Sequence, residues 1–154
     1  MAMRRQRGFS LLEIVVVIVL IAIMATVIAM SVTGGLDSAR VRSASRDVAA
    51  ALRYTRGQAI VHHEQRTLAF NVEERSYRMP DKEPVQLPNG MEMELLTAQS
   101  EMLTDGEGQI RFYPDGSSGG GRVTLIRGEA RWEIEVEWLT GKVRLFDPTE
   151  TADR

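Results

Sequence analysis

Hydrophobic and polar positions divide this chain into three parts that differ in their periodicity. The first part is a run from 14 to 36 that contains no charged residue. A helix rises about 1.5 Å per residue, so about 20 residues cross a bilayer core of about 30 Å. The run exceeds this length, and the pattern therefore predicts a transmembrane helix near the start of the chain.

The second part is amphipathic, because apolar or small residues recur at steps of three or four, the period of one helix face. The residues of this face are Ala39, Val41, Ala44, Val48, Leu52, Thr55 and Ala59. The charged residues of the opposite face are Arg40, Arg42, Arg46, Asp47, Arg53 and Arg56. Such a stripe is typical of a solvated face, with pairing between the subunits of a filament as the alternative. The helix is expected to loosen or kink at Gly34 and Gly35 and to end between 60 and 63.

Beyond the helix, short alternating segments are separated by turn-forming residues, which favours β-strands. The predicted strands are 67–72, 76–79, 91–96, 109–113, 122–127, 132–139 and 142–146. The last two form the clearest hairpin, because apolar residues alternate with Glu133, Glu135 and Glu137 before a turn at Thr140 and Gly141.

Four aromatic residues are predicted to form part of the core of this β-rich region: Trp132, Trp138, Phe112 and Phe146. Trp132 and Trp138 are six positions apart, so in a regular strand they lie on the same face. A shared exposed face would suit stacking on a sugar ring, but burial in a common core is the favoured interpretation. We therefore expect an α+β protein with one β-rich head on the C-terminal half of a long helix.

The residues just before the apolar run carry the most specific signal. Arg4, Arg5 and Arg7 form a basic start, which predicts a cytoplasmic N-terminus under the positive-inside rule. A cleavable secretory signal is the competing interpretation, but its apolar core has only about 7 to 15 residues. Glu13 precedes the uncharged run directly. A carboxylate in a membrane segment costs about 2.5 to 3.5 kcal/mol on insertion scales, so its presence needs a reason.

Residues 7–13, RGFSLLE, resemble the class III signal of type IV pilins and type II secretion pseudopilins. The resemblance implies that a prepilin peptidase cleaves between Gly8 and Phe9 and N-methylates the new amine of Phe9. It also implies that the carboxylate of Glu13 meets the Phe9 amine of a neighbouring subunit, so that two charges neutralise each other during assembly. A helix-start acid favoured by the macrodipole is the alternative role of Glu13.

Residues 112–123 and 138–143 resemble the head of H-type minor pseudopilins of the type II secretion system. That group shares its domain family with certain minor type IV pilins. The resemblance implies a type IV pilin-like fold, in which a long N-terminal helix packs on a C-terminal head of two antiparallel sheets. The expected organisation is a leader at 1–8, a transmembrane helix at 9–35, an amphipathic continuation at 36–63 and a periplasmic head at 64–154.

By this resemblance, the protein is a structural subunit at or near the tip of a periplasmic pseudopilus and helps to export folded proteins across the outer membrane. Its implied partners are the other minor pseudopilins, the major pseudopilin, the prepilin peptidase and the inner-membrane assembly platform. Secreted cargo and the secretin are further candidates. The expected location is the bacterial inner membrane, with a single pass. Loops at 80–89 and 115–121 are the candidate partner surfaces.

Two other functions stay open from the sequence. A minor type IV pilin, acting in pilus initiation or DNA uptake, has a related head. A DNA-binding head needs clustered cations, whereas the formal net charge here is −2, so nucleic acid is disfavoured as a partner. A periplasmic enzyme or receptor with an uncleaved anchor would explain the apolar run but not the motif at 7–13.

Catalytic, metal and cofactor sites are not expected. The chain has no cysteine, and His62 and His63 are adjacent, so in a regular helix or strand they point apart. Asp105, Glu107 and Asp115 offer oxygen ligands for Ca²⁺ but lack the EF-hand spacing. The glycine-rich loop at 115–121 lacks the Gly-Lys-Ser/Thr ending of a phosphate-binding loop, and it is predicted to be a flexible connection.

Overall fold

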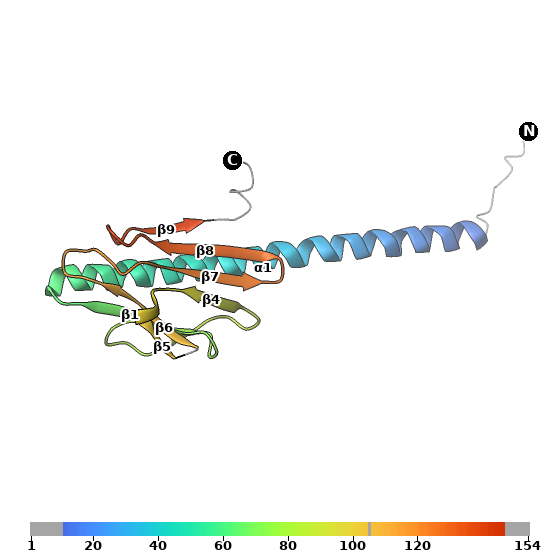
Figure 1. Cartoon of the computed structure of the whole chain (residues 1–154). Coiled ribbons are helices and arrows are strands. Elements are labelled where there is room, and N and C mark those ends of the chain that lie inside the picture. The colour runs from blue at the N-terminus through green and yellow to red at the C-terminus, as the bar shows by residue number, and fades with distance from the viewer. Residues whose placement is uncertain (1–10, 105, 147–154) are drawn as a thin grey trace, which may run out of the picture. The chain divides into compact units, whose positions relative to one another are not determined.

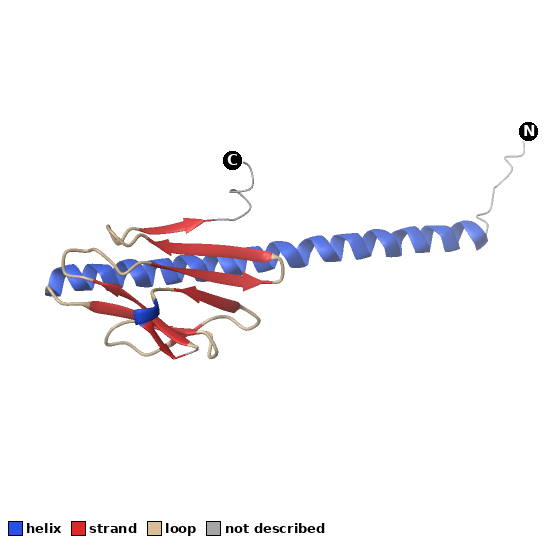
Figure 2. Ribbon diagram, in the orientation of Figure 1, coloured by secondary structure: helices blue, strands red, loops and turns tan. Residues whose placement is uncertain are grey.

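The computed structural model describes residues 11–104 and 106–146, with side chains described throughout except at 27–34 (Figures 1 and 2). The chain separates into two compact units, Met1–Gly35 and Leu36–Arg154. One helix, α1 (Leu11–His62), contributes to both units, and every described strand belongs to the second. The second unit is therefore the predicted head together with the amphipathic part of the helix.

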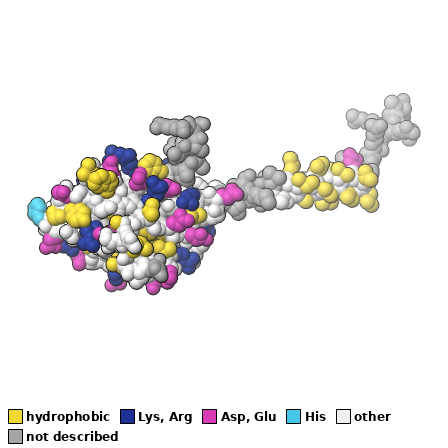
Figure 3. Space-filling model, viewed as in Figure 1, with side chains coloured by type: hydrophobic (Ala, Val, Ile, Leu, Met, Phe, Trp, Pro, Cys, Tyr) yellow, Lys and Arg dark blue, Asp and Glu magenta, His cyan; other side chains and the backbone are white. Residues whose placement is uncertain are grey.

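In the first unit, α1 carries apolar side chains on all sides. Every large hydrophobic residue between Leu11 and Met24 is exposed, and Figure 3 shows one face of this hydrophobic segment. The helix continues through Gly34 and Gly35, so this pair does not interrupt it. Among the residues that the structure describes, no helical stretch has both the length and the hydropathy that crossing a membrane requires. The predicted span at 9–35 includes side chains outside the described set and stays a prediction.

The second unit contains two antiparallel sheets. Sheet A has the order β3-β2-β1-β6-β5, and sheet B has the order β4-β7-β8-β9. A short 3-10 helix, η1 (Gln99–Glu101), joins β4 to β5, where the chain passes from sheet B to sheet A. The predicted α+β arrangement of one long helix and two antiparallel sheets is confirmed. The strands are β1 (Arg66–Asn71), β2 (Ser76–Arg78), β3 (Val85–Gln86), β4 (Glu92–Leu96), β5 (Met102–Thr104), β6 (Glu107–Phe112), β7 (Gly121–Arg127), β8 (Ala130–Val136) and β9 (Val143–Phe146).

β7 and β8 form the longest ladder of sheet B. Their paired residues begin with Gly121 opposite Val136 and end with Arg127 opposite Ala130. This register leaves a two-residue turn that begins at Gly128, whose φ of +57° lies in the left-handed region that glycine adopts without a Cβ penalty. The tight turn fixes the register, and the register decides which residues of β8 face the core.

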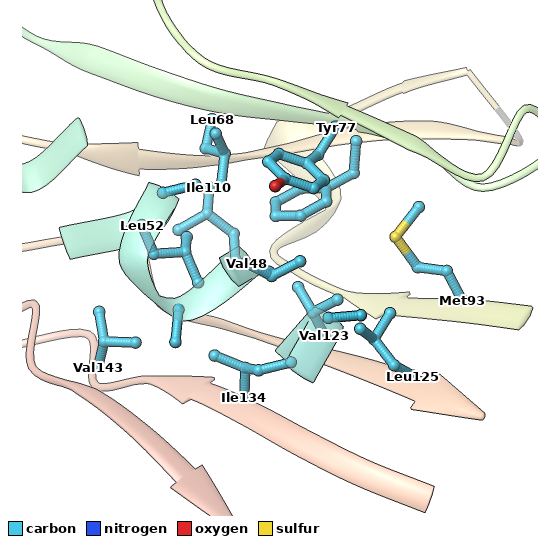
Figure 4. Close-up of a cluster of buried hydrophobic side chains, with 14 of the residues drawn as sticks. Val48, Leu52, Leu68, Tyr77, Met93, Ile110, Val123, Leu125, Ile134 and Val143 are labelled. Carbon is cyan, nitrogen blue, oxygen red and sulfur yellow. The ribbon is translucent and has the colours of Figure 1, made fainter. Parts of the chain in front are cut away.

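The core lies between one face of α1 and the inner faces of both sheets (Figure 4). Val48 and Leu52 of the helix are fully buried at its centre. The strand side chains labelled around them are Leu68, Tyr77, Met93, Ile110, Val123, Leu125, Ile134 and Val143. Full burial of a large aliphatic side chain contributes about 1.5 to 3 kcal/mol. This cluster therefore holds the helix and the two sheets together.

The predicted apolar face of the helix is confirmed from Val41 to Ala59, all of whose predicted members are buried. Ala39 is the exception, because it is exposed. The helix ends at His62, inside the predicted interval. Small residues such as Ala44 and Ala49 on this buried surface let the strands approach the helix closely.

The prediction of a core position is wrong for two of the four aromatic residues. Phe112 and Trp132 are buried, whereas Trp138 is 68% exposed and Phe146 is 36% exposed. β8 ends at Val136, so the alternation of the strand does not extend to Trp138 and the two tryptophans do not share a strand face. Phe146 is the last residue of β9, which lies at the edge of sheet B with no described strand beyond it.

All seven predicted strands are present, with ends shifted by up to three residues. The sequence pattern does not predict β3 and β5, because β3 has only two residues and the three residues of β5 are all exposed and show no alternation. The predicted loop at 80–89 therefore contains a strand, β3, which pairs with β2 at the edge of sheet A.

Candidate functional site

The predicted processing site lies at the start of the chain. Gly8 and Phe9 are outside the described residues, so cleavage and N-methylation there stay predictions. Glu13 lies in the first turn of α1 and is exposed. The helix macrodipole favours an acid at this position. The predicted partner of Glu13 is the amine of another subunit, so its role has to be tested in the assembled filament.

The residues considered as metal ligands are not brought together. Glu107 begins β6 and Asp115 follows its end, so at about 3.3 Å per residue the strand separates them by roughly 15 to 20 Å. Asp105 lies outside the described residues. His62 ends the helix, and His63 has left it, with a φ of +55°. Across 11–104 and 106–146, no group of three or more His, Cys, Asp or Glu side chains is placed to hold a metal ion.

The predicted loop between two strands is present as the β6–β7 connection, and hydrogen bonds attach it to neighbouring segments. The amide of Ser118 donates to the carbonyl of Trp138 at 3.0 Å, and the amide of Gly119 donates to the carbonyl of Arg111 at 3.1 Å. The Ser118 hydroxyl donates to the same Arg111 carbonyl at 2.7 Å. Gly120 has a φ of +76° and lies so close to Trp138 that a Cβ would clash. The glycines therefore permit a tight, fixed path.

The side chain of Asp115 caps the turn in this loop by accepting hydrogen bonds from Ser117. One of its carboxylate oxygens accepts a hydrogen bond from the Ser117 amide at 2.9 Å and another from the Ser117 hydroxyl at 2.6 Å. These two hydrogen bonds hold the pKa of the exposed Asp115 carboxyl below its ordinary value of 3.8, and the bond from the hydroxyl has the larger effect. The contribution of these hydrogen bonds to stability is present when the pH is above the ordinary pKa of Asp115. It is lost as the pH falls through the lowered pKa of the folded state. The cap is therefore fully formed at neutral pH.

Two arginines of the charged helix stripe bind backbone carbonyls of the head. Arg56 donates from Nε to the carbonyl of Gly116 at 2.8 Å and from Nη2 to the carbonyl of Thr140 at 3.0 Å. Arg53 donates from Nη2 to the carbonyl of Val143 at 3.2 Å. The stripe is therefore not merely solvated at these two residues, because Arg56 attaches two loops to α1 and the exposed Arg53 attaches the start of β9 to it.

The β6–β7 loop (113–120) and the β8–β9 turn (137–142) form one surface next to the last turns of α1, here called the distal surface. Within it, Trp138 is 68% exposed and Leu139 is 65% exposed. Figure 3 shows hydrophobic side chains beside Lys and Arg side chains on the head. An exposed aromatic residue among cations is typical of a protein interaction site.

A partly buried ion pair between Glu101 and Arg111 holds η1 against sheet A. Glu101, which is 7% exposed, accepts hydrogen bonds from Arg111 Nε at 2.9 Å and from Gln109 Nε2 at 2.9 Å. The hydrogen bond to Glu101 is the main cause that raises the pKa of Arg111 above its ordinary range. The sequence does not predict this network, because its members meet only when β6 and η1 pack together.

A helix that is apolar in its first part and amphipathic in its second, with two antiparallel sheets against the amphipathic part, defines a type IV pilin-like subunit. Residues 3–29 match the sequence profile described as the prokaryotic N-terminal methylation motif. Residues 44–140 match the profile described as type II transport protein GspH. The chain belongs to this GspH family of type II transport proteins.

Comparisons with individual proteins support this family assignment. The type II secretion system protein H of Xanthomonas campestris pv. campestris is 41% identical over 141 residues, which cover 92% of this chain and 83% of that protein. The fold resembles the minor pseudopilin EpsH from the type 2 secretion system of Vibrio cholerae, with a TM-score of 0.56 and 12% identity over 71% of this chain and 98% of that one. It also resembles the type IV minor pilin FimU of Pseudomonas aeruginosa, with a TM-score of 0.51 and 10% identity over 71% of this chain and 90% of that one. The predicted resemblance to H-type minor pseudopilins is confirmed.

Proposed function

We propose that this protein is a minor pseudopilin that stands at or near the tip of a periplasmic pseudopilus and helps to export folded proteins across the outer membrane. The observation that carries the proposal is that two parts of one chain match two sequence profiles. The start carries the methylation motif at 3–29, and the head carries the GspH profile at 44–140. The role is structural, without catalysis.

Maturation begins in the inner membrane under this proposal. The protein is inserted there with a single pass, its leader in the cytoplasm and its head in the periplasm. Prepilin peptidase cleaves after Gly8 and N-methylates Phe9. During assembly the Glu13 carboxylate neutralises the Phe9 amine of a neighbouring subunit, which removes the cost of two charges in lipid. The motif match across these residues supports this sequence of events.

The partners follow from this assembly route. The inner-membrane assembly platform receives the mature subunit, and the other minor pseudopilins and the major pseudopilin are its neighbours. Every large hydrophobic side chain between Leu11 and Met24 is exposed in the single chain, which supports packing of this part against lipid or against the helices of other subunits. The head is left to contact secreted cargo or the secretin.

A minor type IV pilin is the second candidate, because the fold of FimU is related. In that function the head would act in pilus initiation or in DNA uptake. The 41% identity to a type II secretion protein supports the secretion role, and the formal net charge of −2 disfavours DNA as the partner.

The two candidates predict different companions for the full-length protein. The test is affinity purification from detergent-solubilised envelopes of cells that express both machines, followed by identification of the recovered subunits and a binding assay with labelled DNA. Recovery of the other minor pseudopilins supports the secretion role. Recovery of type IV pilins, or salt-sensitive DNA binding without pseudopilins, would replace it with the second candidate.

A further inference from the structure

A basic groove runs between the start of β9 and the last turns of α1. It has a volume of about 610 Å³, and its charged lining residues are Arg53, Arg56, Glu137, Lys142 and Arg144. β9 is the edge strand of sheet B, so on one side its backbone is not paired with any described strand. The groove is therefore open along a strand edge, where an extended segment of another chain has room to lie.

The charge of this groove departs from that of the protein. Four cations line it against one carboxylate, whereas the whole chain has a formal net charge of −2. Glu137 accepts a hydrogen bond from Thr140 Oγ1 at 2.7 Å and lies 3.8 Å from Arg144. Arg53 and Arg56 bind neutral carbonyls, so their charges are not cancelled. The groove therefore keeps a positive excess that attracts an acidic group.

Two apolar residues lie next to the groove along the chain, because Trp138 and Leu139 fall between its lining residues Glu137 and Thr140. Trp138 also lines a second cavity of about 630 Å³, which shares Glu137, Lys142 and Arg144 with the groove. Trp138 and Leu139 occupy the β8–β9 turn with most of their side chains exposed. The backbone of Trp138 is fixed, because its carbonyl accepts the Ser118 amide and Gly120 packs against it. Trp and Arg are the residues that most often carry binding energy at protein interfaces, and a fixed backbone lowers the entropic cost of binding.

We propose that the basic groove and Trp138–Leu139 together form a docking site for an acidic segment of a neighbouring pilin-like subunit. A nucleic acid suits the surface less well, because the positive excess is confined to the groove, whereas the whole chain has a formal net charge of −2. A long polyanion would extend beyond the groove over a protein of net negative charge, whereas a short acidic segment stays within the groove. The proposal rests on the proposed function as a filament subunit.

The test uses the full-length protein in cells that contain the secretion system. A photo-reactive amino acid replaces Leu139, and the cross-linked partner peptide is identified by mass spectrometry. The same cross-link is measured with Lys142→Glu and Arg144→Glu combined, both exposed residues whose replacement spares the core. The matched control combines Arg75→Glu and Arg78→Glu, which change the charge equally on two exposed positions, one just before β2 and one at its end. A second test variant, Trp138→Ala, removes the apolar anchor.

The proposal expects a cross-link to an acidic segment of another pilin-like subunit. The yield should fall about tenfold in the groove double variant and in Trp138→Ala, and it should stay unchanged in the control. Reversing the charge of the cross-linked acidic segment should restore the yield in the groove variant. A cross-link to a second copy of this chain, to its own residues 147–154 or to nucleic acid would overturn the proposal. An unchanged cross-link yield in the groove double variant would also overturn it.

Failure of this site is distinguishable from failure of the proposed function. If the protein is a pseudopilin but the groove is not a docking site, deletion of the protein stops export while the groove double variant exports normally. If the protein is not a pseudopilin, deletion itself leaves export unchanged. Export is therefore measured in the deletion strain and in both double variants.

Discussion

Arg56 donates its Nε proton to the backbone carbonyl of Gly116 at 2.8 Å, across sixty positions of sequence. The same guanidinium reaches the carbonyl of Thr140 at 3.0 Å. One helix residue thus joins the β6–β7 loop and the β8–β9 turn to the end of α1. The distal surface is therefore held in one arrangement by the last turns of α1.

Replacement of Gly141 by alanine should disrupt this junction. Gly141 has a φ of +63°, and a Cβ there would clash with the carbonyl oxygen of Gly116 and with Arg56. A non-glycine residue in the left-handed region costs about 1 to 3 kcal/mol, before the clash is added. We expect Gly141→Ala to lower the free energy of unfolding by at least this amount in a urea titration.

Gly119→Ala is the matched control for this prediction. No atom lies within 4 Å of the position that its Cβ would take, and its φ is not positive. The substitution should change the free energy of unfolding by less than about 0.5 kcal/mol. Equal losses in the two variants would show that the contact with Gly116 does not govern the stability of the turn.

The two tryptophans should differ sharply in their effect on stability. Trp132 is 8% exposed, and the guanidinium of Arg42 lies 5.5 Å from its ring centroid. Trp132→Ala should cost about 3 to 5 kcal/mol, as expected for a large core residue. Trp138→Ala should cost less than about 0.5 kcal/mol, because its side chain is mostly in solvent. Urea titrations of both variants check this, and similar losses would place Trp138 in the core.

The contrast between these residues explains what could be predicted from the sequence. The alternation around Ile134 identifies the inner face of β8 correctly, because strand geometry is local. The end of the strand depends on where the chain turns back. There Glu137 donates its amide to the carbonyl of Lys142 at 3.0 Å, and the pattern does not reveal this pairing. Trp138 therefore continues the sequence alternation but not the strand.

The candidate site likewise has one part that the sequence predicts and one part that only the fold reveals. The processing motif is contiguous, so Gly8, Phe9 and Glu13 can be proposed from residue order alone. The attachment of Arg56 to Gly116 joins distant parts of the chain through backbone carbonyls, which have no side-chain signature. For this reason the sequence suggests a solvated helix stripe where the structure has a tertiary contact.

Gly8→Ala should leave the leader attached. If prepilin peptidase cleaves after Gly8, the variant keeps the basic residues at the start of the chain and its N-terminus is not converted to N-methylated Phe9. Mass spectrometry of the protein isolated from membranes measures the retained leader directly. Cleavage at the normal position in this variant would refute the predicted site.

Glu13→Val should separate processing from assembly. The variant is expected to be inserted and cleaved normally, because the residues that flank the cut are unchanged. Its incorporation into filaments should fall at least about tenfold, equivalent to about 1.4 kcal/mol, because the Phe9 amine of a neighbour loses its counter-charge. Glu13→Asp keeps the carboxylate and should retain part of the incorporation. Co-assembly at the normal level by Glu13→Val would leave the carboxylate with a helix-start role only.

The most direct test of the central claim is export of a folded type II cargo by cells that lack this protein, with piliation and DNA uptake measured in the same strain. We predict that the cargo accumulates in the periplasm, that the full chain restores its export, that Gly8→Ala does not, and that pili and DNA uptake are unaffected. Normal export with a loss of piliation or DNA uptake would contradict the secretion role and identify the protein as a minor type IV pilin.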